Sequence, residues 1–117
     1  MWRVRAGNLG GDWIWRMANV PIGVNMNYIC VKWKHSRSDD PVWLYSEIDA
    51  NRCETRKVEI YADGRYGFAS AKESSAGTRL GEAPIPSLTE IAYDHQFEPA
   101  EFTKEKFEVV WQRCRSE

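Results

Sequence analysis

The sequence predicts an α+β fold, a four-stranded antiparallel meander sheet with two C-terminal helices packed on one face. Residues 28–68 contain segments in which apolar and polar side chains alternate with the period of a β-strand. Residues 87–115 instead carry helix-capping signals and apolar side chains with the period of a helix. The chain has 117 residues, 43% hydrophobic and 28% charged, which is enough for one domain with its own core.

The first three strands are predicted over Tyr28–Trp33, Val42–Ile48 and Thr55–Tyr61, because apolar side chains alternate in each segment. A polar loop separates the first two strands. It ends at Pro41, which favours an extended backbone at the residue before it. A fourth strand is expected after a turn at residues 62–64.

This turn has either two or three residues, and the hydrophobic pattern decides between them. A three-residue turn with Gly64 in the left-handed region pairs Ile60 with Tyr66 and Val58 with Phe68, so that the apolar faces agree. A two-residue turn would move both aromatic rings to the opposite face of the sheet. We therefore predict the three-residue turn.

Two helices are predicted after a long loop at residues 71–86. Ser87 and Glu90 form a capping-box pattern, which starts a short helix that ends near Tyr93. A second helix is predicted from about Lys104 to Arg115. Four of its side chains share one face and are expected to be buried: Phe107, Val110, Trp111 and Cys114.

Residues 1–25 differ from the rest of the chain, because no strand or helix period persists in them. We expect Met26 to be the natural start, with residues 1–25 an N-terminal extension that is not native. Residues 26–117 then form a single α+β domain. The alternative is a native arm that packs Trp13, Ile14 and Trp15 onto this domain.

Charge and cysteine usage argue against several classes of protein. The net charge is −1, from 16 basic and 17 acidic residues, so the chain lacks the positive field that general nucleic-acid binding needs. No apolar run is long enough to cross a membrane, and no signal peptide is visible. Three cysteines without a CxxC spacing make a poor disulfide framework, which predicts a cytoplasmic protein.

Three longer motifs resemble those of a known family. They are Val42-Trp-Leu-Tyr-Ser-Glu-Ile-Asp49, Arg56-Lys-Val-Glu-Ile-Tyr-Ala-Asp-Gly64 and Gly77-Thr-Arg-Leu-Gly-Glu-Ala-Pro-Ile-Pro-Ser87. Over about Met26 to Trp111 the chain resembles a family of small, single-domain bacterial proteins of unknown function. The resemblance implies a stand-alone bacterial domain, and it carries over no catalytic residue.

The sequence contains few residues in arrangements that are typical of catalytic sites. His35 with Asp39 and Asp40 lacks the spacing of a zinc motif, and we expect a solvated turn there, with no metal and no cofactor. No serine lies in a nucleophile-elbow motif, and the glycines of residues 77–82 are not followed by a phosphate-binding lysine. We therefore favour a protein that is not an enzyme. The alternative is a small hydrolase or nucleotide-binding enzyme with its site in the loop at residues 71–86.

Aromatic residues on the sheet indicate a binding function instead. If both helices cover one face, the opposite face displays aromatic side chains mixed with charges, as recognition surfaces do. Cross-strand ladders of this kind also stabilise sheets that bind nothing. The predicted partner-binding residues are Tyr28, Trp43, Tyr45 and Tyr61, together with Arg79 and Glu82, which we expect to form an ion pair in the loop at residues 71–86.

We predict a non-catalytic protein-binding domain of a bacterial cytoplasm, with an immunity- or antitoxin-like role. Residues 82–117 carry 8 acidic and 4 basic side chains, so the predicted partner is a basic, toxin-like protein.

Overall fold

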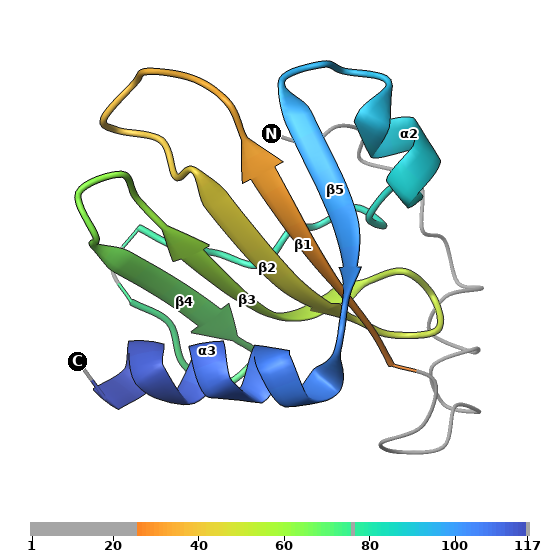
Figure 1. Ribbon diagram of the computed structural model, residues 1–117. Coiled ribbons are helices and arrows are strands. Elements are labelled where there is room, and N and C mark those ends of the chain that lie inside the picture. Colours follow the sequence, from red (N-terminus) through yellow and green to blue (C-terminus); the bar gives the residue numbers. More distant parts are fainter. Residues whose placement is uncertain (1–25, 76, 117) are drawn as a thin grey trace.

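Five antiparallel strands form one sheet in the computed structural model, which describes residues 26–75 and 77–116. The strands are β1 (Asn27–Trp33), β2 (Trp43–Ile48), β3 (Glu54–Ile60), β4 (Tyr66–Ser70) and β5 (Phe97–Phe102). The helices of these residues are α2 (Leu88–Ala92) and α3 (Lys104–Ser116). The strand order is β4-β3-β2-β1-β5 (Figure 1). The predictions for residues 1–25 lie outside the described residues.

The first four strands and the turn between β3 and β4 confirm the sequence prediction. Strands β1 to β4 follow one another across the sheet as a meander. The register pairs Ile60 with Tyr66 and Val58 with Phe68. Gly64 has a φ of 92°, the left-handed conformation that the three-residue turn requires.

Both helices form where their sequence signals lie. The Ser87 hydroxyl accepts a hydrogen bond from the Glu90 N–H, and the Glu90 carboxylate accepts one from the Ser87 N–H, so the capping box is complete. In α3, Phe107, Trp111 and Cys114 are buried, as the helical period predicts, whereas Val110 is only half-buried at the edge of the same cluster. These side chains anchor α3 across strands β1 to β4.

Strand β5 corrects the predicted four-stranded sheet to five strands. It pairs with β1, with Pro99 opposite Val31 and Phe102 opposite Tyr28. A proline usually argues against a strand, but an edge strand tolerates the missing N–H because one of its sides joins no ladder. Pro99 is therefore compatible with β5 at the edge of the sheet.

The two helices lie on opposite faces of the sheet, so the predicted packing of both on one face is wrong. Tyr28 packs with Phe107 and Trp111 of α3, whereas Ile29 packs with Ile91 of α2. Neighbouring residues of a strand point to opposite faces, and the two core clusters are therefore separated by the sheet. In Figure 1, α3 lies in front of the sheet and the segment after β4 passes behind it. We call these faces the α3 side and the α2 side.

Candidate functional site

The α3 side of the sheet carries three rows of side chains that run across the strands, since cross-strand partners share a face. The first row consists of Glu98, Lys32, Trp43, Ile60 and Tyr66. The second row consists of Ala100, Cys30, Tyr45, Val58 and Phe68. The third row consists of Phe102, Tyr28, Glu47, Arg56 and Ser70.

Helix α3 covers the third row. The Phe107 ring lies 5.4 Å from the Tyr28 ring, and the Arg56 guanidinium lies 4.9 Å from the Phe107 ring and 5.0 Å from the Trp111 ring. In the second row, Val58 and Phe68 pack in the same core cluster as Phe107 and Trp111 of α3, and the Phe68 and Trp111 rings meet edge-on at 5.7 Å. Among the described residues, no helix or loop lies over the remainder of β1 and β2 on this side (Figure 1).

This uncovered part forms an aromatic surface, which we define as Lys32, Trp43, Tyr45 and Ile60. The Trp43 and Tyr45 rings stack, with centroids 6.2 Å apart and planes at 16°. The Lys32 ammonium lies 5.8 Å from the centre of the Trp43 ring. Lys32 is exposed and the other three residues are half-buried. The rings are therefore ordered by their neighbours and remain partly exposed.

Tyr45 adds a hydrogen-bonding group to this surface. Burial raises the pKa of its hydroxyl to about 12, with smaller contributions from Cys30 and Tyr66. The hydroxyl therefore stays protonated at neutral pH and can donate a hydrogen bond. The Cys30 thiol beside it is no nucleophile, because burial raises its pKa to about 11.

Tyr28, predicted as an exposed binding residue, is buried beneath α3 with 8% of its surface exposed. Its hydroxyl donates a hydrogen bond of 2.8 Å to Oε2 of Glu47. Burial, reinforced by this carboxylate, raises the pKa of Tyr28 to about 12. The ring belongs to the core under α3 and offers no free face to a partner.

Glu47 and Arg56 form an ion network with Glu108 of α3. One guanidinium nitrogen of Arg56, Nη2, lies 2.7 Å from Glu47 Oε2 and 2.6 Å from Glu108 Oε2. Burial alone would raise the pKa of Glu47, but hydrogen bonds from Arg56, Thr55 and Tyr28 outweigh it and hold this pKa below its usual value. The network ties α3 to β2 and β3.

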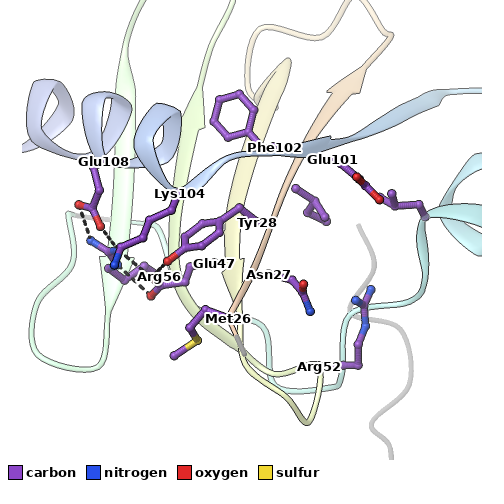
Figure 2. A pocket seen from close by; sticks show the side chains of 12 residues that line it. Met26, Asn27, Tyr28, Glu47, Arg52, Arg56, Glu101, Phe102, Lys104 and Glu108 are labelled. Atoms are coloured by element: carbon purple, nitrogen blue, oxygen red, sulfur yellow. Dashed lines mark hydrogen bonds and ion pairs between the residues drawn. The ribbon is translucent and has the colours of Figure 1, made fainter. Parts of the chain in front are cut away.

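A pocket of about 640 Å³ opens beside this network, where β1 begins (Figure 2). Two of its three carboxylates, Glu47 and Glu108, are held by Arg56, and the third belongs to Glu101. The described residues that line it include no histidine, cysteine or serine. The pocket lining is therefore polar, and most of its carboxylates already have a partner.

The described domain matches one family. The family described as Domain of unknown function (DUF6881) matches residues 27–116. The chain belongs to this family. The resemblance read from the sequence motifs is thereby confirmed, and the matched residues include the five strands β1 to β5 and helices α2 and α3. No curated protein and no solved structure matches the chain.

In the DUF6881 domain, the segment at residues 77–86 closes over buried charges on the α2 side. The Gly81 N–H donates to Glu54 Oε1 at 2.7 Å, and the Ser46 hydroxyl donates to Glu54 Oε2 at 2.7 Å. The Lys57 ammonium lies 3.4 Å from Glu54. The Gly81 amide is thus used internally, and it cannot also cradle a phosphate without breaking this contact.

Glu59 completes the buried cluster. It lies 3.7 Å from Lys57 and accepts a hydrogen bond of 3.5 Å from the Thr78 hydroxyl. Burial raises the pKa of Glu59, opposed by Lys57 and reinforced by Glu54. The loop residues that touch the sheet therefore satisfy buried charges.

The remaining predicted residues do not join the aromatic surface. Arg79 and Glu82 are exposed in the segment that covers the α2 side, and the predicted ion pair between them is not formed in the described residues. Tyr61 follows β3, with the Arg65 guanidinium 4.6 Å from its ring. Of the six predicted binding residues, only Trp43 and Tyr45 lie together on an uncovered surface.

His35 lies in a turn with both ring nitrogens hydrogen-bonded. Its Nε2 donates to the Pro41 carbonyl at 2.8 Å, and its Nδ1 accepts from the Arg37 N–H at 2.9 Å. Within residues 26–75 and 77–116, no three His, Cys, Asp or Glu side chains are grouped to hold a metal ion. None of the helices described here has the length and apolar character to span a bilayer.

Ile60 belongs to the aromatic surface although the sequence does not predict it as a binding residue. The missing signal is the register between β2 and β3, which pairs Trp43 with Ile60 and Tyr45 with Val58. This register places the apolar residues of β3 on the same face as the two rings.

Proposed function

We propose that this DUF6881 domain is a non-catalytic protein-binding domain that recognises its partner through the aromatic surface. The observation that supports the proposal is the stacked pair Trp43 and Tyr45 on a part of the sheet that the described residues leave uncovered. Large rings with polar edges supply contact area with little conformational entropy to lose. The bacterial, cytoplasmic and immunity- or antitoxin-like setting stays a prediction from the sequence.

The edges of the sheet are less suited to a partner than its face. At β4, the Phe68 carbonyl accepts a hydrogen bond from the Ser75 N–H, and the Ser70 N–H donates to the Glu73 carbonyl, so the loop after β4 already pairs with this edge. At β5, Pro99 removes one donor from the other edge. Addition of a strand from a partner is therefore disfavoured at both edges.

The enzyme alternative finds less support. Two polar groups of the loop at residues 71–86 that a hydrolase or nucleotide site could use, the Gly81 amide and the Thr78 hydroxyl, are bound to buried carboxylates. We therefore keep protein binding as the single proposal.

The proposal is tested with the double variant Trp43→Ala/Tyr45→Ala in an affinity capture from native cytosol. We expect loss of the captured protein, with a folded domain by circular dichroism. The matched control is Tyr93→Ala, because Tyr93 is 78% exposed and lies at the end of α2. Capture that survives in a folded double variant would contradict the proposal.

A further inference from the structure

The charges beside the aromatic surface are unbalanced. Lys32 lies at one end of it, and its cross-strand neighbour Glu98 is engaged by Lys34 at 3.1 Å. Lys32 itself forms no ion pair among the described residues, and its ammonium extends over Trp43. This end of the surface therefore carries a positive charge that no carboxylate neutralises by direct pairing.

Helix α3 adds positive charge along the other border. Val110 is half-buried and packs against the same core cluster as Tyr45. Lys106 and Arg113 lie one turn before and one turn after Val110, so they share its side of the helix. Both are exposed, and neither forms an ion pair within the described part of the chain.

Between Lys106 and Arg113, the acidic residue of α3 is Glu108, and it lies on the opposite side of the helix from Val110. Glu108 is two positions from Val110, which turns it about 200° around the helix. Its carboxylate is bound to Arg56 of the third row. Glu108 therefore does not add negative charge to the border of the aromatic surface.

We infer that the partner of the aromatic surface is an acidic protein segment. Its carboxylates would lie near Lys32, Lys106 and Arg113, and an apolar or aromatic side chain would contact Trp43 and Tyr45. This inference rests on the proposed function and replaces the basic partner predicted from composition. An apolar centre with a complementary charged rim is the usual arrangement of such interfaces.

A protein segment fits this surface better than single-stranded nucleic acid does. The chain has a net charge of −1, and three separated cations make no continuous track for a phosphate backbone. Nucleic acid is therefore an outcome that the test must be able to reveal.

The test selects peptides from a random displayed library on the immobilised full-length chain, after peptides that bind the Trp43→Ala/Tyr45→Ala variant have been removed from the library. We expect the peptides that bind the unaltered chain but not this variant to carry a net negative charge and to contain an aromatic or leucine side chain. The charge-reversal variant Lys106→Glu/Arg113→Glu should weaken their binding by about tenfold or more, and more strongly at low salt. The matched control is Arg79→Glu, which reverses an exposed arginine in the segment on the α2 side and should leave binding unchanged.

The outcomes separate this inference from the proposed function. If the selected peptides require Trp43 and Tyr45 but are neutral or basic, the inference of an acidic partner is wrong, while the proposed binding surface is supported. Failure to recover any peptide that distinguishes the chain from the double alanine variant would overturn both. Tighter binding of a fluorescent oligothymidylate than of the selected peptides would overturn the inference in favour of nucleic acid.

Discussion

Replacing Gly67 by alanine is expected to destabilise the domain through one collision. Gly67 lies in β4 opposite Glu59, and a Cβ at this position would collide with Oγ1 of Thr78. Thr78 is 4% exposed, and its hydroxyl is hydrogen-bonded to Glu59 and Ser75. The threonine therefore cannot make room without breaking contacts that hold the loop on the α2 side of the sheet.

The magnitude follows from two opposing effects. Overpacking of a dense interior costs about 1–3 kcal/mol. Gly67 is not in the left-handed region, so alanine strains no backbone angle and gains about 0.4–1 kcal/mol from a less flexible unfolded chain. We expect Gly67→Ala to lower the free energy of unfolding by about 1–2 kcal/mol.

Urea unfolding followed by tryptophan fluorescence measures this difference. The control is Gly81→Ala, whose Cβ would meet only Glu54 Oε1 at an ordinary 3.5 Å, so its stability should equal or exceed that of the unaltered chain. Thr78→Ala removes the colliding atom and should cost about 1 kcal/mol in lost hydrogen bonds. The double variant Gly67→Ala/Thr78→Ala should then be no less stable than Thr78→Ala alone. Equal stability of Gly67→Ala and Gly81→Ala, or simple additivity in the double variant, would refute the packing of this loop.

Four further variants test other parts of the structure by urea unfolding. Arg56→Ala should cost about 3–5 kcal/mol because it leaves the buried carboxylate of Glu47 without its cation, and a near-neutral effect would contradict the network. Trp111→Ala should also cost about 3–5 kcal/mol, whereas the cap variant Ser87→Ala should cost only about 1 kcal/mol; the reverse order would contradict the packing of α3. Because burial raises the pKa of Glu59, its ionisation costs stability as the pH rises from the ordinary carboxyl pKa through the raised one. Glu59→Gln should therefore match the unaltered chain near about pH 4 and exceed its stability at neutral pH, and a difference that does not change with pH would contradict this.

Local signals in the sequence are sufficient to predict the elements whose partners are close in the chain. The register of Val58 with Phe68 follows from one short turn, and Gly64 provides the backbone conformation that this turn needs. Ser87 and Glu90 mark the start of α2 for the same reason, because both halves of the capping box lie within one helical turn.

Local patterns in the sequence do not predict pairings between segments that are far apart in the chain. β5 is missed because Pro99 indicates a loop, and only its position at the edge of the sheet makes a strand possible. Lys57 and Glu59 of β3 have the charged character of solvent-facing residues. In the structure both are buried. Lys57 pairs with Glu59 and with Glu54 of the same strand, and Glu59 accepts a hydrogen bond from the Thr78 hydroxyl of the segment at residues 77–86.

Prediction of the candidate site from the sequence is limited in the same way. Trp43 and Tyr45 are correctly predicted to lie on one face of β2, because alternation within a strand fixes that relation. Tyr28 is predicted on the same surface and shares that face, but α3 covers it, and the helix position depends on contacts more than seventy residues away in the chain. Ile60 enters the surface only through the register of β2 with β3.

The most direct test of the binding surface is an NMR titration that follows the tryptophan indole N–H signals, assigned by single substitutions. The titrant is an acidic peptide from the selection described above. Trp43 lies on the aromatic surface, and Trp111 belongs to α3 and is buried in the core cluster on the α3 side. Trp33 lies on the α2 side, where its ring centroid lies 5.5 Å from that of Phe97. The proposed surface predicts a saturable shift of the Trp43 signal while the Trp33 and Trp111 signals stay in place. Saturable movement of the Trp33 signal with an unmoved Trp43 signal would contradict it.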